Sequence, residues 1–212
     1  MNITIIGTGN IAQGLAASAA KAHHQVTLIS RSNEKSAEVA QTLSDSLNTS
    51  VASGTQVNEA DLVILAVPFK AATTIAAELK LNLEQQVVLD VTNPLTEDFM
   101  GLTVGFNTSA AEHIQRQYPN ALVVKGFNTV FAQVYDQGPD FGQGQQVPVF
   151  LASDYDGAKA TVAKFAESLG FAAIDAGALT NARYIEPMAA LNIQLGYGLG
   201  WGPLISPTWI KR

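Results

Sequence analysis

The stretch that decides the fold of this chain is Ile3-Thr4-Ile5-Ile6-Gly7-Thr8-Gly9-Asn10-Ile11-Ala12. Its β-branched start predicts a buried strand, and an alanine-rich segment with helical spacing follows it as far as Ala22. A G-x-G-x-x-A turn between a strand and a helix is typical of dinucleotide binding, because the bare turn brings N–H groups of the helix start against a pyrophosphate. The small side chain of Ala12 lets helix and strand pack closely. We therefore expect dinucleotide contacts from Gly7, Thr8, Gly9, Asn10 and Ile11.

Segments typical of strands and of helices alternate along the rest of the chain. Strands are predicted over 25–30, 62–67, 86–91, 121–124, 147–151 and 171–175. Helices are predicted over 33–47 (capped by Asn33), 71–81, 109–117, 156–169 and 180–196, and the glycine-rich stretch 126–146 is predicted to be irregular. This alternation indicates an α/β fold: a doubly wound, mostly parallel, Rossmann-like sheet with a small C-terminal helical extension.

Composition excludes several classes of partner. The chain has 212 residues, a formal net charge of −6 and no cysteine. Without clustered Lys and Arg it is not expected to bind nucleic acid, and without cysteine it has no disulfide or thiolate metal site. We predict no metal centre. The start lacks a basic leader, and the apolar stretch 188–205 is interrupted by Asn192, Gln194 and four glycines. We therefore expect a cytoplasmic protein that does not enter a membrane.

The end of the second predicted strand favours NADP(H) over NAD(H). An NAD site usually places Asp or Glu there to bind the ribose 2′-hydroxyl. This chain has Ser30-Arg31-Ser32 instead, with Lys35 close by. A hydroxyl and a guanidinium suit a 2′-phosphate, because Arg forms planar, charge-assisted hydrogen bonds to such groups. Ser30, Arg31 and Lys35 are the candidate 2′-phosphate ligands. The alternative interpretation is that both cations are solvated on the surface.

Three further strand ends carry candidate contacts to the nicotinamide. In an open parallel sheet the ligand lies outside the carboxyl ends of the strands. The segments there are Ala66-Val67-Pro68, Thr92-Asn93-Pro94 and Lys125-Gly126-Phe127-Asn128-Thr129. The alternative is that the prolines terminate strands and the asparagines form turns; the two interpretations are evenly weighted for Pro68 and Pro94, and function is favoured for Asn128-Thr129. The candidate cofactor-binding residues from these segments are Ala66, Val67, Pro68, Asn93, Asn128 and Thr129.

No acid–base residue of the kind that an alcohol dehydrogenase uses is apparent. None of the three histidines falls at a strand end, and all three are interpreted as structural. Lys125 and Tyr184 are the remaining candidates, and a structural role is favoured for each. We therefore assign no catalytic residue. If hydride passes between nicotinamide and a flavin-like ring, the acceptor takes it directly, and the protein supplies alignment and exclusion of water.

The chain resembles the family of NADPH-dependent reductases of the deazaflavin coenzyme and the related cytosolic domain of six-transmembrane ferric reductases, which reduce a flavin. The resemblance spans almost the whole chain. It rests on the segments already quoted together with Asp90-Val91-Thr92-Asn93-Pro94-Leu95, Ser109-Ala110-Ala111-Glu112 and Asp175-Ala176-Gly177-Ala178-Leu179-Thr180-Asn181-Ala182-Arg183. It implies a 2′-phosphate pocket at Ser30, Arg31 and Lys35, and nicotinamide contacts near Val67, Pro68, Asn128 and Thr129. It also implies a homodimer formed through C-terminal elements. Deazaflavin reductases often carry His-Thr where this chain has Asn128-Thr129, so the acceptor stays open between a deazaflavin and FMN or FAD.

These observations lead to a functional hypothesis and two alternatives. The leading hypothesis is an NADPH-dependent oxidoreductase that exchanges hydride with a small-molecule redox acceptor. The alternatives are a non-catalytic NADP(H)-binding redox sensor and, as the least favoured, a reductase of a small imine or 2-hydroxy acid, which needs a larger C-terminal domain. We expect an NADP-binding domain over 1–179 and a helix and tail over 180–212 that cap the acceptor site. For the tail tryptophans, Trp201 and Trp209, packing in the core is favoured over an acceptor pocket or a subunit contact.

Overall fold

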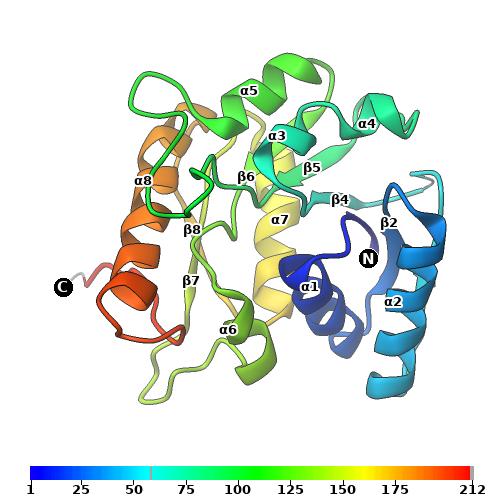
Figure 1. Ribbon diagram of the computed structural model, residues 1–212, viewed down its shortest axis with the longest axis horizontal. Helices are drawn as coiled ribbons and strands as arrows, with labels where there is room; N and C mark the ends of the chain where they lie inside the picture. Colours follow the sequence, from blue (N-terminus) through cyan, green and yellow to red (C-terminus); the bar gives the residue numbers. More distant parts are fainter. Residues whose placement is uncertain (58, 211–212) are drawn as a thin grey trace.

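The fold is organised around one parallel sheet with helices on both faces (Figure 1). The computed structural model describes residues 1–57 and 59–210. Six strands form the main sheet in the order β3-β2-β1-β4-β5-β6, and β7 and β8 form a second parallel pair. Their bounds are β1 (Asn2–Ile6), β2 (Gln25–Ile29), β3 (Val51–Ser53), β4 (Leu62–Leu65), β5 (Val87–Asp90), β6 (Leu122–Lys125), β7 (Pro148–Leu151) and β8 (Ala172–Asp175). The predicted doubly wound, mostly parallel sheet is confirmed.

The helices divide into two layers. They are α1 (Asn10–Lys21), α2 (Asn33–Leu47), α3 (Phe69–Ala72), α4 (Ile75–Glu78), α5 (Ala110–Gln117), α6 (Ala132–Gln137), α7 (Asp156–Ser168) and α8 (Ala182–Ile193), with a 3₁₀ turn η1 (Leu179–Asn181) and a π-helical turn η2 (Gln194–Gly198) at the two ends of α8. Buried side chains of α1, α2, α6 and α7 share one core, and those of α3, α4 and α5 share the other. Within the part of the chain that the structure describes, no helix is long and apolar enough to cross a membrane.

The two cores follow from the alternation of side chains along each strand. On β1, Ile5 faces the core beneath α1 and α7, whereas Ile6 faces the core beneath α4 and α5. The same alternation separates Ile64 from Leu65 on β4. Because both faces of a parallel sheet are covered, its strands consist of nearly uninterrupted apolar residues. This explains why these strands were predictable from the sequence.

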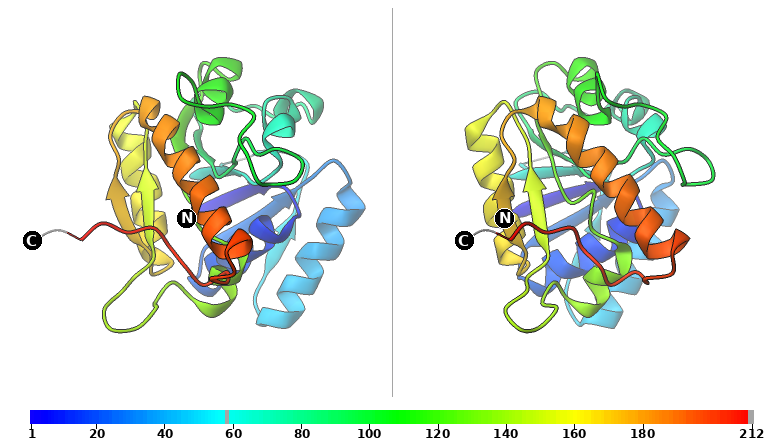
Figure 2. Two further views of the ribbon diagram at one scale, coloured as in Figure 1. Left: turned by 60° about the vertical axis from the view of Figure 1, so that its left-hand side comes forward. Right: turned by 90° about the vertical axis from the view of Figure 1, so that its left-hand side faces the viewer.

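The pair β7-β8 extends the fold beyond β6. The amide N of Lys125 donates to the carbonyl of Ala152 at 2.8 Å, and the amide N of Ala152 donates back at 3.1 Å. This antiparallel bridge places β7 beside the end of β6. Helix α8 then packs Ile185 onto Phe150 of β7, and the C-terminal tail crosses the same strand through a ring contact between Phe150 and Trp209 (Figure 2). The last βαβ unit predicted from the sequence is therefore present as β7-α7-β8, and α8 packs against its β7 strand.

Several predicted elements differ from those observed. The helix expected over 71–81 is wrong: α3 and α4 are separate single turns, because the hydroxyls of Thr73 and Thr74 hydrogen-bond back to carbonyls three residues earlier and interrupt the helix. The cap of α2 is Ser32, whose Oγ accepts from the amide N of Lys35 at 3.1 Å, and Asn33 is the first helical residue. The final helix begins at Ala182, after η1.

Two short elements were not predicted. Strand β3 has three residues and pairs only with β2, at the edge of the sheet. Helix α6 has six residues and lies within the stretch that was expected to be irregular. Both are too short for a hydrophobic period to register in the sequence. Helix α6 nevertheless has a tertiary role, because its Tyr135 packs directly on Gly14 of α1.

Replacing Gly14 with alanine tests that packing. A Cβ at position 14 would lie 2.8 Å from Cβ and Cδ2 of Tyr135, closer than real Cβ contacts occur. We expect Gly14→Ala to destabilise the protein by about 1–3 kcal/mol, even though alanine is intrinsically the better helix former. The matched control is Gly157→Ala in α7, where the new Cβ meets nothing within 4 Å. The control should stabilise by up to about 1 kcal/mol. Urea unfolding measures both free energies, and equal effects would contradict the packing argument.

Candidate functional site

The glycine turn after β1 has two glycines with different constraints. Gly7 has φ of +134°, and a Cβ there would lie 2.2 Å from the carbonyl oxygen of Ala66, so only glycine fits. Gly9 has an ordinary backbone conformation, with φ of −77°, and a Cβ there would meet no protein atom within 4 Å. The protein itself therefore requires a glycine at position 7 but not at position 9. The open space beside Gly9 is where a ligand can approach the backbone.

The start of α1 presents unused N–H groups to that space. Gly9 is the N-cap residue of α1, and no side chain caps the helix there. By contrast, Ser32 caps α2 and Ser109 caps α5 through their hydroxyl oxygens. The turn is held from behind, because Nε2 of Gln13 donates to the carbonyl of Thr8 at 2.9 Å. Free N–H groups together with the helix dipole make this end of α1 suited to an anion such as a pyrophosphate.

A cavity of about 310 Å³ opens directly over the turn, at the carboxyl ends of β1, β2 and β4. It lies where the strand order reverses between β1 and β4, which is the usual ligand position in open α/β sheets. It brings together nine of the residues predicted from the sequence, namely Gly7, Thr8, Gly9, Ser30, Arg31, Lys35, Ala66, Val67 and Pro68. The remaining lining residues, Ile6, Ser32 and Ile75, were not predicted.

The polar residues of this cavity gather at one end. Oγ of Ser30 donates to the carbonyl of Ser32 at 2.7 Å, which shapes the turn between β2 and α2. The side chain of Arg31 is 65% exposed, and its Nε lies 3.9 Å from Oε2 of Glu78. Nζ of Lys35 lies 3.0 Å from Oε2 of Glu38. Two cations thus reach the cavity end from a turn and from the first turn of a helix.

The other predicted residues lie outside this cavity. Asn10 lines a separate, polar cavity beside α6, and Ile11 packs against the core beneath α1. Asn93 and Asn128 are paired with each other: Nδ2 of Asn93 donates to the backbone carbonyl of Asn128 at 2.7 Å, and Nδ2 of Asn128 donates to Oδ1 of Asn93 at 2.9 Å. Thr129 is buried, and its carbonyl accepts from Nδ2 of Asn192 in α8 at 3.1 Å. Nδ2 of Asn128 also donates to the carbonyl of Ile185, so Asn128 and Thr129 contact α8 directly, whereas Asn93 is bonded to Asn128.

A fully buried ion cluster joins β5, β6 and α8. Nζ of Lys125 lies 2.9 Å from Oδ2 of Asp90 and 3.0 Å from Oε1 of Glu186, and it also donates to the carbonyl of Thr92. All three of its protons are thereby used. The carboxylate of Glu186 accepts from the amide N of Ala110 at 2.8 Å, at the start of α5. Burial lowers the pKa of Lys125, but the two carboxylates outweigh it and hold that pKa above its ordinary value. The lysine is therefore charged and fully paired, which supports the structural role favoured for it.

A second ion pair joins α5 to α8 nearer the surface. Nε and Nη2 of Arg183 donate to the two carboxylate oxygens of Glu112 at 2.9 and 2.6 Å. Oγ of Ser109 also donates to Glu112, while it accepts from the amide N of the same residue. The hydrogen bonds from Arg183 lower the pKa of Glu112 below its ordinary value of 4.5. Helix α8 is therefore fixed to α5 at two points, one buried and one partly exposed.

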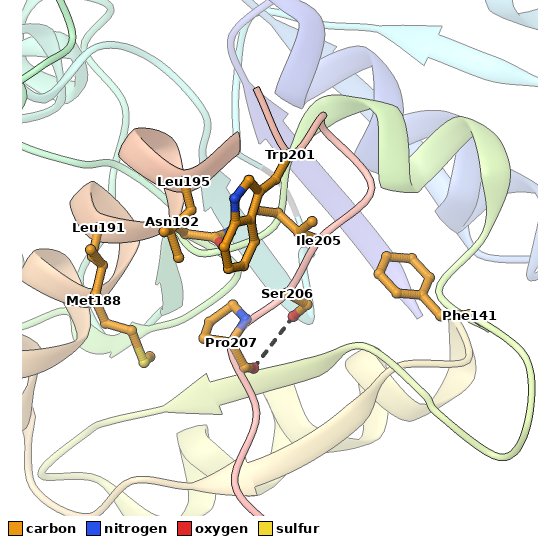
Figure 3. A pocket seen from close by; sticks show the side chains of 9 residues that line it. All are labelled: Phe141, Met188, Leu191, Asn192, Leu195, Trp201, Ile205, Ser206 and Pro207. Carbon is orange, nitrogen blue, oxygen red and sulfur yellow. Dashed lines mark hydrogen bonds between the residues drawn. The ribbon is translucent and has the colours of Figure 1, made fainter. Parts of the chain in front are cut away.

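The C-terminal tail forms an apolar surface together with α8. Trp201 is 64% exposed and Trp209 is 68% exposed, so the expectation that they pack in the core is wrong. The reason is that the tail runs along the outside of α8 and β7 instead of entering a layer (Figure 2). Trp201 and Ile205 of the tail line a cavity of about 290 Å³ together with Asn192 of α8 and Leu195 of η2 (Figure 3). Tyr184 is 73% exposed on the same helix.

Sequence reasoning missed the side chains that fix α8. Glu186 is the one acidic residue of α8 and lies on its buried face, and that is a usable signal, because a charge on a buried face needs a partner. Asp90 ends an apolar strand in the same way. What the sequence did not contain was the pairing, because Asp90, Lys125 and Glu186 lie 35 and 61 residues apart along the chain.

Removing the buried cation tests the ion cluster. Lys125→Met keeps most of the side-chain volume but leaves two buried carboxylates without their cation. We expect a loss of about 3–5 kcal/mol in the free energy of unfolding. Adding Glu186→Gln to this variant should recover part of the loss. The control is Lys159→Met, which removes an ion pair to the exposed Asp175 and should cost less than about 1 kcal/mol. A loss as small for Lys125→Met would show that the cluster does not anchor α8.

The Glu112–Arg183 pair predicts an acid-sensitive contribution to stability. Because the folded-state pKa of Glu112 is depressed, this contribution is complete above about 4.5 and is lost as pH falls through the folded-state pKa. Glu112→Gln should therefore be less stable than the wild type at neutral pH, and the difference should shrink on acidification. Urea unfolding midpoints of both proteins, measured from neutral pH to below 4.5, give this difference in stability. Arg183→Met should abolish the same component, and the double variant should lose little more than either single one. Parallel pH profiles for wild type and Glu112→Gln would contradict the assignment.

Comparisons with known proteins agree with this geometry. A family model described as NADP oxidoreductase, coenzyme F420-dependent, matches residues 2–94. The F420-dependent NADP reductase of Methanothermobacter marburgensis is 31% identical over 209 residues, which cover 92% of this chain and 92% of the relative. The metalloreductase STEAP3 of Rattus norvegicus is 28% identical over 184 residues, and this chain spans about a third (35%) of its length.

The fold of a solved relative is matched from end to end. A crystal structure of a candidate F420-dependent NADP-reductase from Arthrobacter sp. FB24 has 28% sequence identity and a TM-score of 0.83, and the match covers 100% of both chains. The expected family resemblance is thereby confirmed. The chain belongs to the family of coenzyme F420-dependent NADP oxidoreductases, and it is an NADP-dependent oxidoreductase.

Proposed function

We propose that this enzyme transfers hydride between NADPH and the ring of a deazaflavin or flavin, and that NADP(H) binds across the carboxyl edge of the sheet. The observation that carries the proposal is the cavity over the glycine turn, because one opening joins the free helix start to the two cations. A deazaflavin is the first choice of acceptor, since relatives that match this chain over nearly its whole length are F420-dependent NADP reductases.

The cavity supports a specific orientation of the dinucleotide. The N–H groups at the start of α1 hold the pyrophosphate, and the bare backbone at Gly9 lets it approach closely. Ser30, Arg31 and Lys35 hold the 2′-phosphate through a hydroxyl and two charges. The nicotinamide then extends along Ala66-Val67-Pro68 toward the paired amides of Asn93 and Asn128. Oδ1 of Asn128 is buried and lacks a hydrogen-bond partner among the described residues, so it is available to a carboxamide N–H group.

The chain's own residues orient and shield the reaction. NADPH supplies the hydride when it is bound, and the acceptor ring receives it without an acid–base residue of the protein. Helix α8 lies beside the proposed nicotinamide position. Its Ile185 carbonyl accepts from Asn128, and its Asn192 side chain donates to the carbonyl of Thr129. The ion cluster at Lys125 fixes this helix, so the spacing between the two rings does not depend on a mobile element.

We further propose that residues 1–179 form the NADP-binding domain and that the helix and tail from 180 onward cap the acceptor site; residues 211 and 212 lie outside the described part of the chain. A homodimer through α8 and the tail is supported by an apolar cavity of about 740 Å³, whose wall includes Phe150, Tyr184 and Trp209. Contiguous apolar surface of this kind is typical of subunit contacts. Sedimentation equilibrium is the direct measurement.

Turnover with defined acceptors tests the proposed reaction. Purified protein is mixed with NADPH and, in separate reactions, with coenzyme F420, FMN or FAD, while the nicotinamide absorbance is followed. We expect acceptor-dependent oxidation of NADPH, fastest with the deazaflavin, and slower oxidation of NADH because it lacks the 2′-phosphate. NADPH binding without turnover on any of the three acceptors would favour the non-catalytic redox sensor instead.

Two variants connect that activity to the cavity. Gly9→Ala should weaken NADPH binding at least tenfold with only a small drop in melting temperature, since the added Cβ meets only the space assigned to the pyrophosphate and the one structural cost is a poorer N-cap. Arg31→Ala should raise KM for NADPH about tenfold or more and leave KM for NADH nearly unchanged. Retention of normal NADPH affinity in both variants would place the cofactor elsewhere.

A further inference from the structure

Arg31, a cation at the edge of the cofactor cavity, is paired with a carboxylate from a different element. Nε of Arg31 lies 3.9 Å from Oε2 of Glu78. Glu78 is the last residue of α4, and Ile75 at the start of the same helix lines the cavity wall. The carboxylate is held in place from its other oxygen, because Oγ1 of Thr74 donates to Oε1 of Glu78 at 2.6 Å. Glu78 is therefore oriented toward Arg31 by its own helix.

The charges around this end of the cavity do not add up to a basic pocket. Arg31 and Lys35 are the cations, while Glu34, Glu38 and Glu78 stand beside them. Glu34 accepts from Oγ of Ser32, and hydrogen bonds from its own amide N and from Ser32 lower its pKa, so it is ionised at neutral pH. Three carboxylates thus accompany two cations. A 2′-phosphate carries nearly two negative charges at neutral pH and has to be bound within this balance.

Glu78 differs from the other two carboxylates in where it comes from. Glu34 and Glu38 belong to α2, the same helix as Lys35, and pairs spaced three or four residues apart are usual on an exposed helix. Glu78 belongs to α4, which follows β4, whereas Arg31 follows β2. The two strands lie on either side of β1, so the two side chains meet from different elements. Both side chains are substantially exposed, at 65% and 45%, so their pairing contributes little to stability. The pairing instead affects how tightly Arg31 can bind an anionic ligand.

We propose that Glu78 is a specificity-determining residue that competes with the 2′-phosphate for Arg31 and holds the affinity for NADP(H) below what the two cations alone would give. The inference rests on the proposed binding of the 2′-phosphate at Ser30, Arg31 and Lys35. A carboxylate at this point repels a phosphate but not a ribose hydroxyl. Glu78 therefore reduces the difference in affinity between NADP(H) and NAD(H). The lower affinity for NADP(H) also favours release of this cofactor after hydride transfer.

The test compares Glu78→Gln with a matched charge removal at the other edge of the sheet. Glutamine keeps a carbonyl oxygen for the hydroxyl of Thr74 and removes only the charge. The control is Glu84→Gln, because Glu84 precedes β5 at the amino edge and pairs with Asn120. Calorimetry at low ionic strength gives the dissociation constants for NADPH and NADH. We expect Glu78→Gln to bind NADPH about three- to tenfold more tightly and NADH within twofold of wild type, and Glu84→Gln to match wild type.

A double-mutant cycle separates competition for Arg31 from a general charge effect. In the Arg31→Ala background, Glu78→Gln should lose most of its gain in NADPH affinity, because the residue for which the two anions compete is absent. Raising the salt concentration should also shrink the gain. In steady state, Glu78→Gln should lower KM for NADPH without raising kcat, as expected for a change in binding alone.

Three outcomes would overturn the inference: an unchanged NADPH affinity in Glu78→Gln, an equal gain for NADH, or a full gain retained without Arg31. If wild-type protein binds NADPH and NADH equally and Arg31→Ala changes neither, the proposed 2′-phosphate site itself fails. If wild type prefers NADPH through Arg31 but Glu78→Gln has no effect, only the role of Glu78 fails.

Discussion

The position of the C-terminal helix depends on one buried cation. Lys125 lies between Asp90 and Glu186 with no exposure to solvent, and it joins two strand ends to a helix that begins more than fifty residues later. Burying three charges is tolerable only because each is paired and hydrogen-bonded, and the start of α5 completes the set through Glu186. Small displacements of α8 would leave a charge unpaired. The helix therefore forms a fixed wall beside the strand ends, where Asn128 donates to its Ile185 carbonyl and its Asn192 donates to the carbonyl of Thr129.

The carboxyl edge of the sheet has two environments that suit two parts of one cofactor. At the β2 end, the side chains are exposed and charged, which suits the proposed binding and release of a phosphate. At the β6 end, the polar groups are buried amides held in a fixed arrangement, as alignment of a planar ring requires. The glycine turn lies between the two, where the backbone is open to a ligand. In the proposed binding mode, affinity and reactivity are controlled by different residues, and loss of the Glu78 charge is expected to act on binding alone.

The elements predicted from the sequence are those whose signal is local. Strands β1, β4 and β5 are apolar runs stopped by glycine, by Pro68 or by Asn93-Pro94, and they appear within one or two residues of their expected ends. Helices α1, α2, α5 and α7 are long enough for a period to show. The elements that were not predicted correctly are short or interrupted: β3, α6 and the pair α3-α4. Packing against neighbouring elements stabilises them, and the hydrophobic periodicity of their own sequence does not show it. The expectation that Trp201 and Trp209 pack in the core was wrong because large aromatic side chains are usually buried, whereas here they form part of an exposed apolar surface.

The sequence by itself determined the sheet, the glycine turn, the Ser30-Arg31 pair and the class of cofactor, because each depends on residues within a few positions of one another. Only the tertiary structure decided which charges meet. It joined Asp90, Lys125 and Glu186 in one buried cluster, brought Glu78 to Arg31 and separated Asn128 from the cavity over the glycine turn. The physical reason is that turns and strands follow from local sterics and hydrophobic pattern, whereas an ion pair follows from how distant segments pack, and no local pattern specifies that packing.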